Sequence, residues 1–284
     1  MFSYKQTIMK EITLGHTPDS DDAFMFFALD SGELDMRGFS IQHVIEDIET
    51  LNMRALNNEL DVTAVSAHAY GYLQDYVILR SGGSFGINYG PVVLSKRKLS
   101  MGELRNSRIA IPGKMTTANL LLRLTIGNFE AVEMKFDLIP KAIKSLSVDA
   151  GVVIHEMQLS YGDDVELVID LGKWWNLQTN GLPVPLGINV ASRKGLSPLE
   201  INKFNALFRE SIEYGLNHVE DALDYSMRYG RGQSRDIIAR FVKMYVNYLT
   251  VDMGENGKNS IIRLLEKAKS HGILEYDKVV FSEG

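Results

Sequence analysis

Residues 148–158 read Val-Asp-Ala-Gly-Val-Val-Ile-His-Glu-Met-Gln, an apolar run that ends in a single histidine. Three β-branched residues in succession, Val152, Val153 and Ile154, predict a strand buried on both faces, which is typical of the covered sheets of α/β proteins. His155 then lies at the carboxyl end of that strand, where open α/β sheets bind their ligands. From this stretch alone, a catalytic histidine and a core-edge histidine bonded to a backbone carbonyl are equally well supported.

The composition limits the class of protein. With 284 residues, the chain predicts two domains or one large α/β unit. Its hydrophobic fraction of 45% and charged fraction of 23% are typical of soluble globular proteins, and no apolar run of about 20 residues predicts a membrane span. The 30 basic and 36 acidic residues give a net charge of −6, which disfavours nucleic acid as a partner.

The residue types also narrow the chemistry and the location. The sequence contains no cysteine, which excludes disulfides, a thiolate nucleophile and a cysteine-ligated metal. Residues 1–10 lack the apolar core and the small-residue cleavage site of a secretory signal, so we expect a cytoplasmic protein.

Strands and helices alternate over the first two thirds of the chain. Apolar runs predict strands at residues 11–16, 39–45, 61–65, 92–95, 107–111 and 165–171, and helical spacing predicts helices at 23–29, at 47–58 and up to residue 124. Beyond residue 195 helices are expected over 197–219, 220–229, 234–248 and 255–270. Ser197 and Glu200 form a capping-box pattern with Pro198 at the first helical position. The pattern predicts two α/β lobes followed by helices, with the ligand in the crevice between the lobes.

Polar groups at strand and helix ends are candidate ligand contacts. Ser66 follows a strand and is expected to expose its hydroxyl and nearby N–H groups. Thr116 and Thr117 open a helix whose first amides offer a site for a carboxylate or a phosphate, with a plain threonine N-cap as the alternative. Gly113 and Lys114 resemble the end of a P-loop, but the earlier glycine and the Ser or Thr after the lysine are absent. A Walker motif is therefore rejected.

Three aspartates, Asp19, Asp21 and Asp22, precede and open the first helix. A hard cation could bind them, but the glycine and the terminal glutamate of a calcium loop are absent, and helix capping with dipole complementarity is the simpler interpretation. The glycine-rich stretch 81–91, with Ser84 and Gly86, predicts a loop whose backbone is open to a ligand. It is not a dinucleotide fingerprint, because a strand follows it.

Aromatic residues gather in two places. Trp174 and Trp175 are expected in a loop, where paired aromatics pack a corner of the core more often than they meet a ligand. Helical spacing predicts core positions for Phe241, Met244, Tyr245 and Tyr248.

Several of these motifs together resemble the menaquinone-biosynthesis enzymes of the futalosine route, and the 1,4-dihydroxy-6-naphthoate synthase family in particular. The resemblance covers nearly the whole chain. The matching stretches are His-Thr-Pro-Asp-Ser-Asp-Asp-Ala-Phe-Met at 16–25, Ser-Ala-His-Ala-Tyr at 66–70, Tyr-Gly-Pro at 89–91, Thr-Thr-Ala at 116–118, Ile-His-Glu at 154–156, Gly-Lys-Trp-Trp at 172–175, Leu-Pro-Val-Pro-Leu-Gly at 182–187 and Met-Tyr-Val-Asn at 244–247.

The resemblance implies a fold of the α/β class with two lobes, like the type II periplasmic binding proteins. It places a ligand cleft between the lobes and returns the C-terminal helices to the first lobe. The first lobe is then expected to comprise residues 1–95 and 191–284, and the second lobe residues 96–190. The sequence departs from the family pattern in an amino-terminal extension and at Ile188, where a second glycine is expected after Gly187.

The resemblance also implies a lyase that uses neither a cofactor nor a metal. The expected substrate is cyclic dehypoxanthine futalosine, cleaved to 1,4-dihydroxy-6-naphthoate and a sugar-derived aldehyde fragment with His155 as general base. A homodimer is left open. The family motifs and the positions at strand ends together assign substrate contacts to Ala64, Val65, Ser66, Ser84, Gly86, Asp19, Thr116, Thr117 and Ala118.

The chemistry of histidine agrees with this role. An imidazole, whose ordinary pKa is about 6.5, accepts a proton near neutral pH, which suits carbon–carbon cleavage that leaves an aromatic product. Glu156 follows His155 and, on a continuing strand, points to the opposite face, so it is not expected to orient the imidazole. The alternatives are chorismate dehydratase, a non-catalytic binding protein for small carboxylates and, with less support, a metal-dependent hydrolase using Asp19, Asp21 and Asp22.

Overall fold

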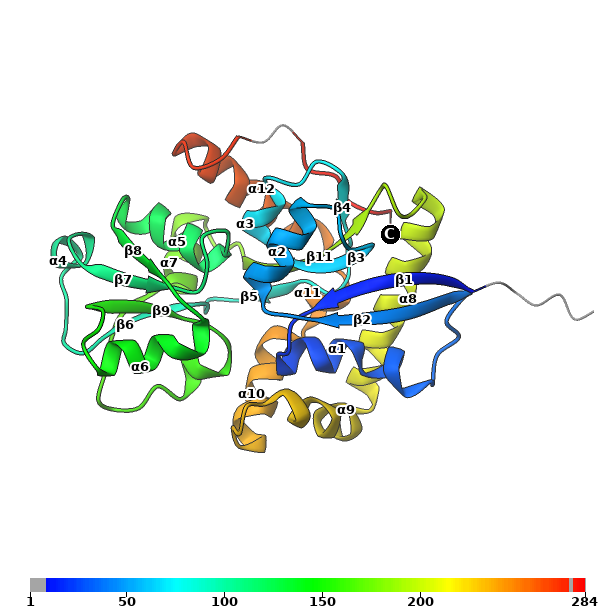
Figure 1. The fold of residues 1–284 in the computed structure, drawn as a ribbon, viewed down its shortest axis with the longest axis horizontal. Coiled ribbons are helices and arrows are strands. Elements are labelled where there is room, and N and C mark those ends of the chain that lie inside the picture. Colours follow the sequence, from blue (N-terminus) through cyan, green and yellow to red (C-terminus); the bar gives the residue numbers. More distant parts are fainter. Residues whose placement is uncertain (1–8, 276–277, 284) are drawn as a thin grey trace, which may run out of the picture.

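Two separate β-sheets organise the chain, one in each of two lobes (Figure 1). The structure is a computed structural model and describes residues 9–275 and 278–283. Most of the segment considered as a secretory signal, residues 1–8, lies outside the described residues. Among the helices that the structure describes, none is long and apolar enough to cross a membrane.

The first sheet has the strand order β2-β1-β3-β11-β4, and the short strand β5 also pairs with β11. Parallel pairing joins β1 to β2 and β3, whereas β11 runs antiparallel to its neighbours. The strands are β1 Lys10–His16, β2 Phe39–Ile45, β3 Val62–Ser66, β4 Tyr76–Ile78, β5 Ser84–Gly86 and β11 Val184–Ser192, and the helices of this region are α1 Ser20–Ser31, α2 Ile48–Leu56 and α3 Ala67–Tyr70.

The second sheet has the strand order β10-β6-β9-β7-β8 and places β9 at its centre. All residues of β9, Ala150–Val153, are buried, as the β-branched run predicts. The other strands are β6 Val92–Ser95, β7 Arg108–Ile111, β8 Glu130–Glu133 and β10 Glu166–Asp170. The helices are α4 Met101–Arg105, α5 Thr117–Ile126, α6 Ile139–Lys144 and α7 Leu171–Gln178, with the 3₁₀ helices η1 Phe136–Leu138 and η2 His155–Leu159.

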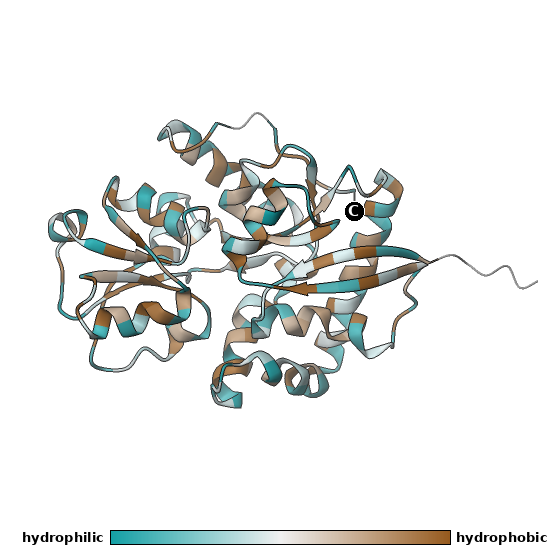
Figure 2. Ribbon diagram, in the orientation of Figure 1, coloured by the Kyte–Doolittle hydropathy of each residue, from teal (hydrophilic) through white to brown (hydrophobic). Residues whose placement is uncertain are grey.

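The C-terminal helices return to the first lobe. Helix α1 packs against α8, α9 and α10, and α12 packs against β11 and α3 and also reaches α5 (Figure 1). The predicted capping box of Ser197 and Glu200 is confirmed at the start of α8. The elements are α8 Pro198–Asn217, α9 Val219–Ser226, η3 Met227–Tyr229, α10 Arg235–Tyr245, α11 Tyr248–Val251 and α12 Gly254–Ser270. Brown and teal residues alternate along these helices in Figure 2, as expected for helices that bury one face.

The chain crosses between the sheets twice, and both crossings fall before the expected lobe boundaries at residues 95 and 190. Strand β5 belongs to the first sheet and β6 to the second, so the first crossing is the segment 87–91. The second crossing lies between β10 and β11. The apolar pattern predicts β6 but not β11, and it carries no signal for which sheet β6 joins.

Three further expectations are wrong. The glycine-rich stretch contains the strand β5. The two tryptophans lie on helix α7, and the fully buried Trp175 donates from its Nε1 to the Pro183 carbonyl at 2.9 Å. Tyr248 is 66% exposed, because the helix predicted over 234–248 breaks at Val246, whereas Phe241 and Tyr245 are buried as predicted.

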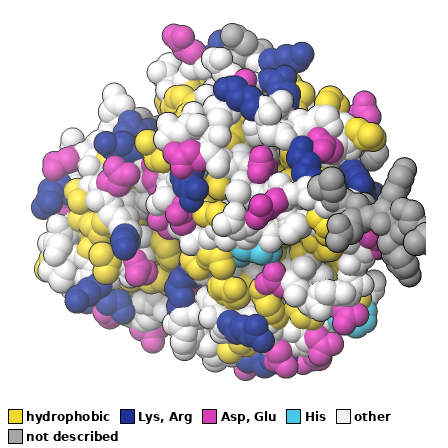
Figure 3. All heavy atoms as spheres, turned by 45° about the vertical axis from the view of Figure 1, so that its right-hand side comes forward, with side chains coloured by type: hydrophobic (Ala, Val, Ile, Leu, Met, Phe, Trp, Pro, Cys, Tyr) yellow, Lys and Arg dark blue, Asp and Glu magenta, His cyan; other side chains and the backbone are white. Residues whose placement is uncertain are grey.

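Figure 3 shows Lys and Arg interspersed with Asp and Glu over one face, so the charge there is mixed in sign.

A close backbone contact fixes the first crossing. The N–H of Leu171 donates to the Pro91 carbonyl at 2.9 Å, which brings the start of α7 onto the segment 87–91. At Gly172 an added Cβ would lie 2.0 Å from the Tyr89 carbonyl carbon and 2.3 Å from the Gly90 nitrogen. Only glycine permits this approach of α7 to the crossing.

We expect Gly172→Ala to lower the free energy of unfolding by about 1–3 kcal/mol, because the new methyl group must displace backbone. The matched control is Gly102→Ala in α4, where an added Cβ meets nothing within 4 Å. Alanine in that helix should be neutral or stabilise by up to about 1 kcal/mol. Urea denaturation of both variants measures the difference, and equal midpoints would contradict the role given to Gly172.

Candidate functional site

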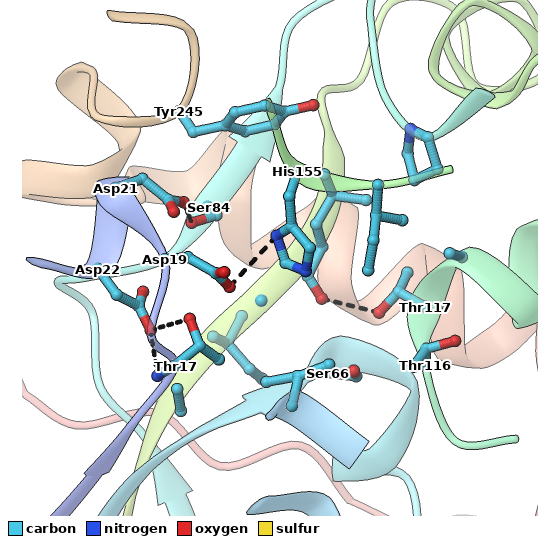
Figure 4. Close-up of a pocket in the computed structure, with 18 of the residues that line it drawn as sticks. Thr17, Asp19, Asp21, Asp22, Ser66, Ser84, Thr116, Thr117, His155 and Tyr245 are labelled. Carbon is cyan, nitrogen blue, oxygen red and sulfur yellow. Dashed lines mark hydrogen bonds and ion pairs between the residues drawn. The ribbon is translucent and has the colours of Figure 1, made fainter. Parts of the chain in front are cut away.

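A cavity lies between the lobes. The space in it that is free of protein atoms is about 740 Å³, which includes the part open to solvent. The first lobe contributes the segment that joins β1 to α1, the end of β3, strand β11 and helix α10. The second lobe contributes the start of α5 and the residues that follow β9. Figure 4 shows side chains from both lobes pointing toward this space. The labelled residues that line it are Thr17, Asp19, Asp21, Asp22, Ser66, Ser84, Thr116, Thr117, His155 and Tyr245.

His155 lies in this cavity, two residues beyond the end of β9. Its backbone φ of +59° is in the left-handed region, so the strand stops and the 3₁₀ helix η2 begins there. The imidazole Nδ1 lies 3.2 Å from Asp19 Oδ2, and the ring packs edge-on against Phe136 with 4.5 Å between ring centroids. Its side chain is 16% exposed, and Nε2 has no hydrogen-bond partner among the described residues. The geometry therefore presents Nε2 as the ring nitrogen free to meet a ligand.

Asp19 is the group that orients His155, and it comes from the other lobe. One carboxylate oxygen meets the imidazole, and the other accepts from the Arg231 guanidinium. Burial opposes ionisation of Asp19, but the charges of His155 and then Arg231 outweigh burial and hold its pKa below the ordinary value. Both oxygens are engaged within the protein, and Asp19 lines the cavity as the partner of His155. Its contact with the substrate stays a prediction.

The three aspartates lie at the start of α1 as predicted, with Asp21 and Asp22 in its first turn, but their side chains do not form a cap bond. Asp19 occupies the N-cap of α1 without a side-chain cap bond. Asp22 instead accepts from the N–H and the hydroxyl of Thr17, each at 2.8 Å, and Asp21 accepts from the Ser84 hydroxyl at 3.2 Å. Within residues 9–275 and 278–283, no group of three or more His, Asp or Glu side chains is placed to hold a metal ion.

Burial and neighbouring charges give these three carboxyl groups different pKa values. It raises the pKa of Asp21 well above the ordinary value, and the charges of Asp22 and Asp19 add to this effect. Burial and the charge of Asp19 raise the pKa of Asp22 to about 7. The ionised carboxylate of the group is therefore Asp19, beside His155.

Strand β3 delivers the predicted residues alternately to the cavity and to the core. Ala64 and Ser66 line the cavity, whereas Val65 is fully buried on the opposite face, so its predicted contact is wrong. The Ser66 N–H is not free, because it donates to Asn52 Oδ1 at 2.8 Å. Asn52, a fully buried asparagine within α2, also donates to the Ser66 hydroxyl at 3.3 Å. Asn52 thus fixes the hydroxyl that faces the cavity.

Helix α5 begins at the cavity with Thr116 as its N-cap. The Thr116 hydroxyl accepts from the Asn119 N–H at 3.3 Å and donates to the Gly113 carbonyl, so the plain threonine cap is confirmed. The Thr117 hydroxyl donates to the Leu186 carbonyl at 2.7 Å, which joins the lobes. The N–H groups of Thr117 and Ala118 have no acceptor in the described part of the chain, and both residues line the cavity. A carboxylate fits this helix start.

Of the two contacts expected from the glycine-rich stretch, one lies at the cavity and one does not. Ser84 lines the cavity, but Gly86 does not. An added Cβ at Gly86 would lie 2.0 Å from the Tyr89 carbonyl oxygen, so this glycine serves packing.

Comparison with known proteins decides the family. The family model described as menaquinone biosynthesis matches residues 12–270. This chain belongs to the menaquinone-biosynthesis family. A 1,4-dihydroxy-6-naphthoate synthase of Thermus thermophilus is 38% identical over 93% of this chain and 96% of its own length. A synthase of the same name from Streptomyces coelicolor is 32% identical over 93% of this chain and 94% of its own length.

Solved structures confirm the predicted fold. A protein of Archaeoglobus fulgidus superposes with a TM-score of 0.89 at 45% identity, covering 95% of this chain and 100% of that one. The periplasmic aliphatic sulphonate-binding protein of Escherichia coli superposes with a TM-score of 0.66 at 15% identity, covering 95% of each chain. The family member therefore has the two-lobed fold of periplasmic binding proteins.

One polar contact of the family member's cavity was not expected from the sequence. Gln158 on η2 donates from Nε2 to the Tyr245 hydroxyl at 3.0 Å, which joins the second lobe to α10 at the cavity wall. The matched stretch 244–247 contains Tyr245, and its polar hydroxyl was the available signal. Ile188, the departure from the family pattern, is fully buried on β11, where it pairs with Val65 of β3. It is also one of the residues that line the cavity.

His68 joins the lobes on the other side of the cavity. Its N–H donates to the Thr117 hydroxyl at 3.2 Å, and its Nδ1 lies 3.3 Å from the Thr116 carbonyl. The residue is 2% exposed, and its Nε2 has no partner in the described residues. Burial lowers the pKa of His68 to about 4, against a smaller opposing effect of the Thr116 carbonyl.

This depressed pKa predicts a loss of stability in acid. Between pH 6.5 and about 4 the unfolded chain binds a proton at His68 that the folded chain does not, so the free energy of unfolding falls as the pH falls. The contribution is on the order of 3 kcal/mol across this interval. His68→Leu and His68→Gln should both have flatter curves, with the glutamine variant less destabilised at pH 7 because it can still donate to Thr116. Denaturation at a series of pH values tests this, and curves parallel to wild type would contradict it.

Proposed function

We propose that this protein is a 1,4-dihydroxy-6-naphthoate synthase that cleaves cyclic dehypoxanthine futalosine. The names of the relatives, which match over 93% of the chain, support the reaction. The observation that carries the assignment of residues is the pair of His155 and Asp19, which meets inside the interlobe cavity. The expectations of a cytoplasmic location, a homodimer and a reaction without a cofactor stay predictions.

His155 acts as the general base in this proposal. Neutral imidazole accepts at Nε2 the proton of a hydroxyl on the sugar-derived carbon that is bonded to the ring system, while the Asp19 carboxylate holds Nδ1–H and stabilises the imidazolium that forms. The electron pair of the O–H bond forms the C=O bond of the aldehyde as the carbon–carbon bond breaks. The electron pair of the broken bond stays with the ring system, which becomes aromatic and takes up a proton.

The remaining walls suit a flat aromatic acid. Ile48, Leu186 and Phe241 give the cavity apolar surfaces beside its polar groups. The free N–H groups of Thr117 and Ala118 at the start of α5 bind the naphthoate carboxylate in this proposal. The carboxylate is then held at one end of the cavity while the opposite end meets the base.

We expect His155→Asn to fold and to lower kcat by about 10²- to 10⁴-fold, because asparagine cannot accept the proton. Product analysis of wild type and variant with the cyclic substrate measures the effect. Incubation with chorismate in parallel tests the sister dehydratase activity. Near-normal naphthoate formation by His155→Asn would refute the role of His155, and conversion of chorismate alone would refute the proposed reaction.

Asp19→Asn separates orientation from proton transfer. The amide keeps the size of the side chain but loses the charge that stabilises the imidazolium, so kcat should fall by about 10²-fold or more while KM changes little. Steady-state kinetics with a circular dichroism check of folding measure this. A rise in KM at unchanged kcat would instead assign Asp19 to substrate binding.

A further inference from the structure

We propose that Arg231 is a positioning residue that couples contact between the lobes to the orientation of His155. The inference rests on the proposed role of His155 as base. Arg231 lies in the first lobe, in the turn between η3 and α10. Its guanidinium donates to Asp19 and, at 2.7 Å, to the Pro18 carbonyl of the same lobe. It also reaches Glu156 Oε2 of the second lobe at 3.4 Å.

The guanidinium also contacts the second lobe through a ring. It lies 4.7 Å from the centroid of Phe136, and the same ring packs against the His155 imidazole. Arg231 thus contacts the carboxylate that orients His155, the residue that follows His155 and the ring beside it. These three contacts surround the base without a direct contact to its reactive Nε2.

Charge explains why this position needs a cation. The side chains of Asp19 and Glu156 are 3% and 2% exposed. Among the described residues, Arg231 is the Arg or Lys that forms an ion pair with each of them. The other Glu156 oxygen accepts from the Ser20 hydroxyl at the start of α1, so a second-lobe carboxylate is seated in the first lobe. Without Arg231, two buried carboxylates from different lobes would face each other with little compensation, which favours separation of the lobes.

Separation would also dismantle the base. Asp19 belongs to the first lobe and His155 to the second, so their pair exists only while the lobes are in contact. Lysine cannot replace arginine fully here, because the site uses several N–H donors in one plane and a flat face against Phe136.

The test uses Arg231→Met and Arg231→Lys, with Arg235→Met as the matched control. Arg235 lies four residues further on and has a side chain that is 39% exposed. Among the described residues it forms ion pairs only with Glu220 and Asp224 of its own lobe. The natural sequence has no cysteine, so Leu177→Cys on α7 and Leu199→Cys on α8, both 78% exposed, accept one spin label in each lobe. The interlobe distance, the imidazole ¹⁵N signals of His155, and kcat and KM are then measured.

For Arg231→Met we expect a longer or broader interlobe distance without ligand, shifted His155 signals and a kcat lowered by about 10- to 100-fold. Arg231→Lys should recover only part of kcat, and Arg235→Met should match wild type in all three measurements. A wild-type distance and wild-type His155 signals in Arg231→Met would overturn the proposal.

If Arg231→Met fails to fold, Phe136→Leu removes the ring under the guanidinium while retaining apolar volume, and unchanged His155 signals in that variant would equally overturn the coupling. The distance and the ¹⁵N signals need no substrate. If the wild-type protein does not turn over the cyclic substrate, the proposed function is refuted. The interlobe distance and the ¹⁵N signals still decide whether Arg231 couples the lobes to His155.

Discussion

The contact between the Asp19 carboxylate and the His155 imidazole is the one on which the arrangement of the site depends. Each lobe contributes one partner, and the second oxygen of Asp19 pairs with Arg231. Taking these groups out of water is costly unless they are paired and hydrogen-bonded. The fold meets this cost by placing the Arg231 guanidinium on the second oxygen of Asp19. The same guanidinium also contacts Glu156 of the second lobe, so it supports the contact between the lobes beside His155.

The two other aspartates make this pair more specific. Asp21 and Asp22 lie within three residues of Asp19, yet burial raises the pKa of each, so neither competes as a full charge for His155 near neutral pH. Their hydrogen bonds with Ser84 and Thr17 hold the start of α1 in place. A stretch that resembles a cation site in sequence is instead one ionised carboxylate, Asp19, beside two carboxyl groups whose pKa values are raised.

The sequence predicts local structure well and contacts across the cleft poorly, and the reason is physical. The β-branched run at 152–154 predicts β9, and the capping box predicts the start of α8, because both signals act within a few residues. The alternation of strand β3 could also have placed Val65 in the core. Arg231 is 212 residues from Asp19 along the chain, and only the packing of the lobes brings them together. Glu156 contacts Ser20 and Arg231 and not His155, but strand periodicity could not show these contacts, because the left-handed turn at His155 ends the strand.

The fold is shared with proteins that bind solutes, so the cleft itself does not determine a reaction. A solute-binding protein needs groups that hold its ligand, and the free N–H groups at the start of α5 are of that kind. A lyase also needs a base whose orientation is set while water is excluded. In this chain the proposed base, His155, and the carboxylate beside it come from opposite lobes, so in the proposed mechanism contact between the lobes completes the reactive group. An aspartate in the first lobe and a histidine just after the central strand of the second would then link that contact to the chemistry.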